Sequence, residues 1–289
     1  MSFKTTVDLY GLSIKEFIEK ALEEDVGNGD HTSLATIRDD ARSTAIVKVK
    51  EKGVIAGLVV ADQILNQVDP TTVVKVLVGE GTAVMPGDEV IHIEGKTRSL
   101  LKAERLMLNC MQRMSGIATK TSALMKLIDG TRARLLDTRK TTPNFRLFEK
   151  WAVAIGGGTN HRFGLYDMIL IKDNHVDASG GIENAIVRAR EYIKSTGKNL
   201  QIEIETRNLD EVQQVLRQGG IQRIMLDNFS NENLLAAVKL INGRLETEAS
   251  GGITEDTIRS VAETGVDFIS VGALTHSYTS LDINMKIQS

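Results

Sequence analysis

The chain has few of the residues that cross-link or rigidify a fold. Its 289 residues include 1 cysteine and 3 prolines. A single thiol excludes an internal disulfide and a cysteine-based metal site, and the neighbours of Cys110 predict a buried structural residue. With so little proline, long structureless loops are not expected. No apolar run approaches the roughly 18 residues that a membrane-spanning helix needs, so no membrane partner is expected.

The chain also lacks a strong excess of either charge. It carries 35 Lys and Arg against 38 Asp and Glu, a formal net charge of -3. Nonspecific nucleic-acid binding depends on a basic surface, so nucleic acid is not an expected partner. Residues 1–20 contain neither the apolar core of a secretion signal nor an Arg- and Ser-rich transit pattern. A cytoplasmic location is therefore expected.

The first part of the chain mixes helices with alternating strands. Apolar residues recur at helical spacing in residues 14–24, and they alternate with polar residues in residues 43–51. Residues 98–116 predict a long helix whose polar stripe contains Arg105. A separate helix is predicted for residues 120–128. These elements predict a strand-rich first domain, with shorter strands over residues 73–78 and 89–93.

After Gly130 the pattern changes to strands and helices in alternation. Buried strands separated by amphipathic helices predict a parallel sheet covered by helices. Six such units fit an incomplete or irregular α/β barrel. A doubly wound open sheet is the alternative, but residues 137–140 lack the nucleotide fingerprint that normally follows its first strand. The predicted strand ends are Asp137, Ile171, Glu205, Leu226, Ser250 and Gly272, and the predicted helices are residues 181–195, 210–218, 231–242 and 254–264.

Positively charged side chains gather near the ends of the early strands. Residues 132–175 contain 8 Lys and Arg against 4 Asp and Glu. The active face of an α/β barrel lies at the carboxyl ends of its strands, so these cations are expected to converge. Together they are suited to carboxylates or phosphates, whereas any one alone could be a solvated surface residue. The candidates are Arg139, Lys140, Arg162 and Lys172, with His161.

The later strand ends carry acids and then glycines. Glu205 and Asp227 follow neighbouring strands, and carboxylates together with phosphates are the usual ligands of Mg²⁺. Taken singly, each acid fits a helix cap or a salt bridge equally well. Glycine turns at residues 250–252 and 271–273 have backbone N–H groups suited to a phosphate. This order of cations, acids and glycines predicts an enzyme that binds a phosphorylated sugar, a divalent metal and a second anionic substrate.

Long motifs in the same segments match a known family. They include Asp-Thr-Arg-Lys-Thr-Thr-Pro at residues 137–143, Gly-Gly-Gly-Thr-Asn-His-Arg at 156–162 and Leu-Ile-Lys-Asp-Asn-His at 170–175. Further matches lie at residues 24–33, 104–105, 112–118, 203–205, 225–228, 248–252 and 270–276. On these residues the chain resembles the quinolinate phosphoribosyltransferases, carboxylating nicotinate-nucleotide pyrophosphorylases of the type II phosphoribosyltransferase family. The resemblance spans nearly the whole chain.

The resemblance implies a fold and a reaction. The fold is an N-terminal α/β sandwich domain, residues 1–116, followed by an incomplete α/β barrel, residues 117–274, while residues 275–289 could pack against the first domain. The pentosyltransferase reaction joins quinolinate to phosphoribosyl pyrophosphate, with Mg²⁺ as cofactor. It gives nicotinate mononucleotide, pyrophosphate and CO₂ in de novo NAD biosynthesis. The resemblance also implies a homodimer whose site is shared between subunits, with higher oligomers left open.

Roles for the candidate residues follow from the same resemblance. The carboxylates of quinolinate would be held by Arg139, His161, Arg162 and Lys172, together with Arg105 from a second subunit. Lys140 would serve phosphoribosyl pyrophosphate, and Glu205 and Asp227 would lie around Mg²⁺ and the ribose. Lys140, Lys172, Glu205 and Asp227 are the catalytic candidates, with the division of labour between the two lysines left open. The other substrate-binding candidates are Thr138, Ser250, Gly251, Gly252, Val271, Gly272, Ala273 and His276.

Two other functions remain open from the sequence. A relative of the same fold could accept nicotinate or a similar base without decarboxylation, although one carboxylate fewer would need fewer cations. A non-catalytic sensor of phosphorylated ligands is the second alternative, but the chain keeps every expected cationic and metal-binding position. No nucleophile–base pair is visible, so no covalent enzyme intermediate is expected.

Overall fold

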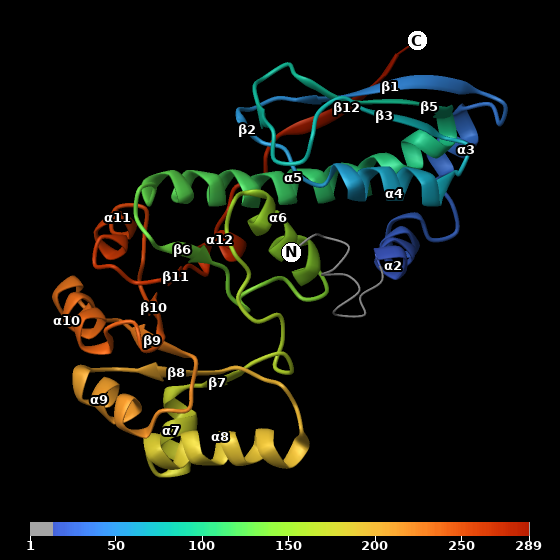
Figure 1. Cartoon of the computed structure of the whole chain (residues 1–289). Helices are drawn as coiled ribbons and strands as arrows, with labels where there is room; N and C mark the ends of the chain where they lie inside the picture. The colour runs from blue at the N-terminus through green and yellow to red at the C-terminus, as the bar shows by residue number, and fades with distance from the viewer. Residues whose placement is uncertain (1–13, 289) are drawn as a thin grey trace. The chain divides into compact units, whose positions relative to one another are not determined.

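Two β-sheets of different construction organise the chain in the computed structural model, which describes residues 14–288 (Figure 1). The first sheet is antiparallel and the second is parallel. They belong to two compact units. Within the described residues, the first unit comprises residues 14–122, 141–157 and 275–288, and the second comprises residues 123–140 and 158–274. Residues 1–13 and Ser289 of the predicted domains lie outside the described residues.

The sheet of the first unit is built from strands that are distant in sequence. Ala45, Val47 and Val49 are buried on one face of β1, which confirms the alternation predicted for this segment. The last strand of the chain, β12, pairs antiparallel with β1. In spatial order the strands are β12 (Ile283–Gln288), β1 (Arg42–Val49), β5 (Glu89–Lys96) and β3 (Val73–Val76), and a separate short pair is formed by β2 (Gly53–Val54) and β4 (Ala83–Val84).

Helices and one aromatic cluster complete the first unit. Phe17 packs against Phe145 and Phe148, with ring centroids 5.6 Å and 4.5 Å away. This contact ties the segment of residues 141–157 to the first helix of the described chain. The Cys110 thiol is buried, and burial raises its pKa to about 12, so it is an inert structural residue. The helices are α2 (Ile14–Val26), α3 (His31–Thr36), α4 (Leu58–Val68), α5 (Thr97–Leu127) and α6 (Arg146–Ile155).

The two helices predicted over residues 98–116 and 120–128 are a single helix, so that part of the prediction is wrong. Helix α5 runs for 31 residues without interruption. Gly116 lies within it because a side chain there would collide with the backbone of Thr279. The glycine therefore marks a close approach of two chain segments rather than a helix end. None of the helices formed by residues 14–288 is long and apolar enough to cross a membrane.

The second unit contains a parallel sheet whose strand order is that of an open barrel. The strands follow one another in sequence from β7 to β11, and β11 then pairs with β6, the earliest strand of the unit. A doubly wound sheet would reverse direction at a switch point, so this order confirms the incomplete barrel. Within the described residues, β6 and β7 do not pair. The strands are β6 (Arg134–Leu136), β11 (Phe268–Ser270), β10 (Glu246–Ser250), β9 (Arg223–Asp227), β8 (Ile202–Thr206) and β7 (Ile169–Ile171).

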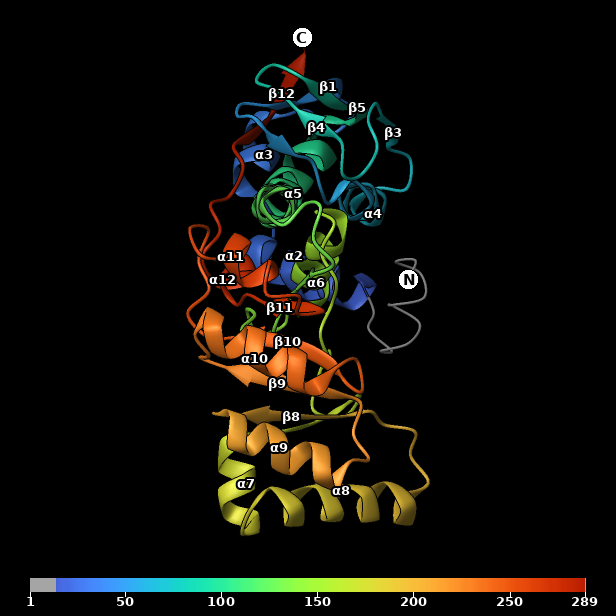
Figure 2. The ribbon, with the colours of Figure 1, turned by 60° about the vertical axis from the view of Figure 1, so that its left-hand side comes forward.

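Helices follow the strands of the second unit and pack against one another in sequence order. Helix α8 contacts α9, α9 contacts α10, and α10 contacts α11, as Figure 2 shows around α9 and α10. The helices are α7 (Asp173–Ser179), α8 (Ile182–Thr196), α9 (Leu209–Gln218), α10 (Asn231–Ile241), α11 (Ile258–Ala262) and α12 (Ala273–His276). This succession of strand and helix places all the strand ends of the unit at one edge.

The helix predicted over residues 254–264 is shorter than expected. Helix α11 spans Ile258–Ala262 alone. The preceding residues form a turn in which the Thr257 hydroxyl accepts a hydrogen bond from the Thr254 N–H at 2.9 Å. Threonine hydroxyls compete with helical hydrogen bonds in this way, so the apolar periodicity extended beyond the true helix.

Candidate active site

The residues predicted at the barrel strand ends lie at the carboxyl edge of the parallel sheet. Residues 137–140 follow β6, Lys172 follows β7, Glu205 lies near the end of β8, and Asp227 ends β9. Ser250 ends β10, and residues 271–273 follow β11. His161 and Arg162 lie between α6 and β7. Parallel strands present their carboxyl ends at one edge, so the structure gathers these candidates within the second unit.

Asp137 is a buried anchor immediately before the predicted cations. Its Oδ1 accepts a hydrogen bond from the backbone N–H of His161 at 2.9 Å, and its Oδ2 accepts one from the Asn160 amide at 2.6 Å. The carboxylate therefore joins the end of β6 to the loop that carries His161 and Arg162. Beyond it, the Thr138 hydroxyl accepts a hydrogen bond from the Lys140 N–H at 3.0 Å, which shapes the turn.

Arg139 lies near enough to Arg162 for its charge to act on that side chain. Burial and the nearby charge of Arg139 both lower the pKa of Arg162. The Arg162 Nη1 donates to the carbonyl of Met168 at 3.3 Å, which fixes the side chain over the start of β7. Like charges in a partly buried site repel one another, and an anionic ligand relieves that repulsion. The pair is therefore suited to a carboxylate or a phosphate.

Lys172, Glu205 and Asp227 form a mixed cluster at neighbouring strand ends. The Lys172 Nζ lies 3.6 Å from the Glu205 Oε2. Burial raises the pKa of Glu205, and the charges of Asp227 and Asp173 raise it further against the opposing effect of Lys172. Carboxylates that repel each other in this way are a suitable pair of oxygen ligands for a divalent cation.

Two glycine turns lie beside the acids. Gly251 has a φ of 94°, and a side chain there would collide with the Asn228 side chain. Asn228 is itself held by a hydrogen bond from its N–H to the Ser250 carbonyl at 2.8 Å. The backbone can therefore approach a ligand closely at residues 250–252. On the other side, the Val271 N–H donates to the Leu136 carbonyl at 3.0 Å, which fixes the start of residues 271–273.

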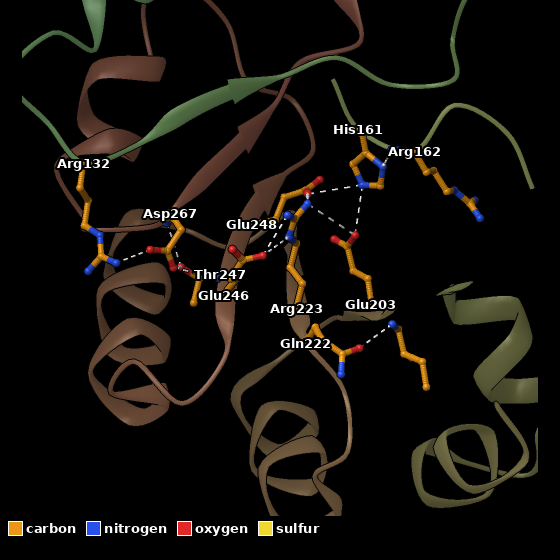
Figure 3. A network of polar contacts seen from close by, with 11 residues as sticks. Arg132, His161, Arg162, Glu203, Gln222, Arg223, Glu246, Thr247, Glu248 and Asp267 are labelled. Carbon is orange, nitrogen blue, oxygen red and sulfur yellow. Dashed lines mark hydrogen bonds and ion pairs between the residues drawn. The ribbon is translucent and has the colours of Figure 1, made fainter. Parts of the chain in front are cut away.

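A buried ionic cluster contains one predicted residue and three that sequence reasoning left without a role (Figure 3). The His161 Nε2 lies 3.1 Å from Glu203 Oε2 and 3.4 Å from Glu248 Oε2. Arg223 Nη1 lies 3.5 Å from Glu248 Oε2, and Arg223 also pairs with the exposed Glu246. A signal for this cluster was present in the sequence. Glu203 stands two residues before Glu205 in an otherwise apolar strand, so both point to the same face of β8.

Burial and the neighbouring charges determine the protonation of the residues in this cluster. Burial opposes the charge on His161, but Glu203 and Glu248 outweigh it and raise the pKa of His161. Burial and Glu248 raise the pKa of Glu203 to about 7. The Arg162 N–H donates to His161 Nδ1 at 2.7 Å, so Nδ1 carries no proton in this geometry. The ring proton therefore lies on Nε2, where it faces the two glutamates.

Two predicted residues belong to the first unit instead. Arg105 is exposed on α5, and His276 contacts the Ser277 hydroxyl through its Nδ1 at 2.7 Å. The second unit by itself therefore offers paired guanidiniums, two lysines, two acids and two glycine turns at one edge. These groups can bind an anion of at least two carboxylates, a phosphorylated ligand and a divalent cation.

Family comparisons cover both units of the chain. The model for the quinolinate phosphoribosyl transferase N-terminal domain matches residues 30–115, and that for its C-terminal domain matches residues 117–286. The chloroplastic carboxylating nicotinate-nucleotide pyrophosphorylase of Arabidopsis thaliana is 46% identical over 291 residues, which cover 96% of this chain and 83% of the relative. The probable enzyme of that name from Bacillus subtilis is 37% identical, covering 96% and 94% of the two chains.

Solved structures give the same result. NadC from Streptococcus pyogenes has a TM-score of 0.91 and 39% identity, covering 95% of this chain and 96% of the other. The nicotinate-nucleotide pyrophosphorylase from Francisella tularensis has a TM-score of 0.89 and 38% identity, with the same coverage of both chains. From the strand-end residues, both domain matches and these relatives, we conclude that the chain belongs to the quinolinate phosphoribosyltransferase family.

Proposed function

We propose that this protein catalyses the transfer of a phosphoribosyl group to quinolinate in de novo NAD biosynthesis. The observation that carries the proposal is the placement of Arg139, Arg162 and Lys172 at the carboxyl edge of the parallel sheet, where burial and the charge of Arg139 lower the pKa of Arg162. A dicarboxylate supplies the two negative groups that such a set of cations needs. Membership of the family supplies the reaction type.

The site divides into two halves in this proposal. Arg139, His161, Arg162 and Lys172, with Arg105 of a second subunit, hold the carboxylates of quinolinate. Lys140, Glu205 and Asp227 face phosphoribosyl pyrophosphate. The glycine turns receive the phosphate through their backbone N–H groups. Thr138, Ser250, Gly251, Gly252, Val271, Gly272, Ala273 and His276 complete the substrate-binding set.

The reaction needs positioning and charge stabilisation rather than a protein nucleophile. The pyridine nitrogen attacks the anomeric carbon, and the bond to pyrophosphate breaks with its electron pair leaving on the pyrophosphate oxygen. The transition state has oxocarbenium character, so cations near the leaving group lower its energy. The quaternised ring then loses its 2-carboxylate as CO₂, because the positive nitrogen stabilises the electron pair that remains. A proton from solvent completes nicotinate mononucleotide.

We also propose Mg²⁺ as the cofactor. Burial and, after it, the charge of Asp227 raise the pKa of Glu205, and a cation bound by these two acids would offset both effects. Mg²⁺ favours oxygen ligands and commonly takes carboxylates together with substrate phosphates. Its chemistry when bound would be to neutralise charge on the pyrophosphate.

The direct test is release of CO₂. Purified protein is incubated with quinolinate labelled at its 2-carboxylate, phosphoribosyl pyrophosphate and Mg²⁺, and labelled CO₂ and nicotinate mononucleotide are measured. Equal amounts of the two products support the proposal. Product from nicotinate alone would favour a non-decarboxylating relative, and ligand binding with no product would favour a sensor.

A homodimer with a shared site is the proposed assembly, with higher oligomers possible in the family arrangement. Arg105 lies exposed on α5, so it is available to a second copy. Arg105→Ala should be inactive alone, as should Lys140→Ala. Mixing the two variants should restore part of the activity, because one of the two sites in a mixed dimer would be intact. No recovery after demonstrated subunit exchange would contradict the shared site.

A cytoplasmic location is proposed as well. The free, buried thiol of Cys110 is compatible with a reducing compartment. Fractionation of the source cells, followed by immunodetection of the full-length protein, would test this location.

A further inference from the structure

The buried cluster consists of His161, Glu203, Glu248 and Arg223. Each of its two glutamates precedes a candidate-site residue on the same strand. Glu203 precedes Glu205 by two residues on β8, and Glu248 precedes Ser250 by two residues on β10. Alternate residues of a strand point to the same face. Each cluster carboxylate and the candidate-site residue two positions later therefore both face the barrel interior. Glu203 and Glu248 are fully buried. Burial raises the pKa of Glu203, whereas the contact and charge of His161 lower the pKa of Glu248 in spite of its burial. Stability alone does not explain a buried pair of this kind.

Both ring nitrogens of His161 face protein groups. Nδ1 accepts the hydrogen bond from the Arg162 N–H, and Nε2 faces Glu203 and Glu248 (Figure 3). The ring is 6% exposed. His161 therefore connects the two carboxylates with the backbone of the arginine that follows it.

The loop that carries Arg162 is held from two sides. From β6, Leu135 accepts a hydrogen bond from Thr159 at 2.8 Å, and Asp137 accepts the His161 N–H. From β8 and β10, Glu203 and Glu248 lie 3.1 Å and 3.4 Å from the His161 Nε2. A change on the second side leaves the first side intact, so the loop should shift locally rather than unfold.

We propose that Glu203 and Glu248 are positioning residues, which orient the His161 ring so that Arg162 meets the substrate carboxylate. The proposal deepens the proposed function and rests on it, since it takes Arg162 as a quinolinate ligand. In this role the His161 ring connects the two glutamates to the backbone of Arg162.

The same three side chains have the composition of a metal site, since the nearest ligand atoms of His161, Glu203 and Glu248 lie within 4.8 Å of one another. The geometry disfavours a metal there. A metal would need the Nε2 lone pair, which would move the proton to Nδ1 and against the Arg162 N–H. The positive Arg223 guanidinium, 3.5 Å from Glu248, would also repel it.

The kinetic test compares Glu248→Gln with Glu246→Gln. Both residues lie on β10 and pair with Arg223, but Glu246 is partly exposed and does not contact His161. Glu248→Gln should raise the KM for quinolinate roughly tenfold and leave the KM for phosphoribosyl pyrophosphate unchanged. Glu246→Gln should change neither. Equal increases in both KM values, or the same effect in both variants, would overturn the proposal.

A double-mutant cycle tests whether the effect passes through His161. In a His161→Gln background, Glu248→Gln should add nothing to the KM for quinolinate, because the connecting ring is already absent. Full additivity would contradict the connection. If Glu248→Gln does not fold, Glu203→Gln carries the same test, because Arg223 then keeps both Glu246 and Glu248.

An independent measurement keeps this inference separate from the activity. In wild-type protein labelled with ¹⁵N-histidine, His161 should give the Nε2–H tautomer with Nδ1 as a hydrogen-bond acceptor, whether or not quinolinate is the substrate. Loss of the signal in His161→Gln assigns it. An Nδ1–H tautomer, or a metal retained in stoichiometric amount by wild type and lost in Glu248→Gln, would overturn the inference. Failure of the CO₂ assay with the expected tautomer would instead reject the proposed function.

Discussion

The two units each bury an ionic cluster, and the clusters are satisfied to different degrees. In the first unit, the fully buried Glu149 accepts hydrogen bonds from Arg113 Nε at 3.1 Å, Arg113 Nη2 at 2.6 Å and the Thr142 N–H at 3.1 Å. The Arg113 guanidinium also lies over the rings of Phe145 and Tyr278. In the second unit, neither oxygen of Glu203 receives a well-directed hydrogen bond from residues 14–288.

This difference separates a structural cluster from a functional one. Every hydrogen-bonding oxygen of Glu149 has a donor, so its burial is compensated by three bonds. The His161 Nε2 is shared between two carboxylates, and among the described residues neither Glu203 oxygen has a hydrogen bond that offsets its burial. Proteins keep such a cost where a site needs it. The first cluster should therefore govern stability, and the second unit should govern activity.

Removing a cation from the edge of the second unit should have the largest effect. Lys140→Ala should lower turnover by about 10³-fold, because one preorganised charge near the leaving group is lost. Its thermal unfolding midpoint should stay near that of wild type, since Lys140 is exposed. Steady-state kinetics and a thermal melt check the two parts. Near-normal turnover would remove Lys140 from the site.

Breaking the satisfied cluster of the first unit should cost stability instead. Glu149→Ala should lower the free energy of unfolding by about 3 kcal/mol, because it leaves the Thr142 N–H and Arg113 without their shared acceptor. Urea denaturation measures the change. Glu149→Gln, which keeps two acceptor lone pairs, should lose less. A stable Glu149→Ala protein that has lost activity would reverse the comparison between the clusters.

The glycine turn of the second unit should show a smaller effect on stability. Gly251→Ala should cost about 2 kcal/mol, because the new Cβ meets the Asn228 side chain at a positive φ. Gly243→Ala is the matched control. Its φ of 71° is also positive, but no atom lies within 4 Å of the added Cβ, so the cost should be about half as large. Equal losses in urea denaturation would show that contact with Asn228 is unimportant.

A neutral cap in the second unit gives the smallest expected change and a baseline for the ionic effects. The Ser230 side chain accepts a hydrogen bond from the Asn233 N–H at the start of α10. Ser230→Ala should cost about 1 kcal/mol, and Ser230→Asp should keep most of the stability. Differential scanning calorimetry of the two variants checks the order. A larger loss of stability in Ser230→Ala than in Glu149→Ala would contradict the large contribution to stability expected of the first cluster.

Strong periodicity made much of the fold predictable. The alternation of Ala45, Val47 and Val49 fixes the buried face of β1, and the regular spacing of strand ends from Glu205 onward identifies the parallel sheet. The prediction of two separate helices in place of α5 was wrong because a glycine that looks like a local helix end has a tertiary cause. Gly116 suggests a helix end, but it is there for the close approach of Thr279.

The strand-end residues could be predicted because position along a barrel strand determines which residues reach the edge. The buried cluster could not be predicted, because His161 is distant in sequence from Glu203 and Glu248, and only the folded unit brings them together. The role of His161 remains a prediction in both its forms, as a direct ligand from the resemblance and as a positioning residue from the geometry.

The pairing of β12 with β1 also affects the order of synthesis. During translation, all residues of the second unit up to Leu274 are made before β12. Until then β1 has no strand to pair with on the edge that β12 later occupies. Strand edges that wait unpaired are open to pairing with other chains. Cutting the chain after the barrel would expose the same edge of β1 and remove Thr279 from Gly116. The first unit is thus encoded in separated segments, and its folding depends on completion of the chain through β12.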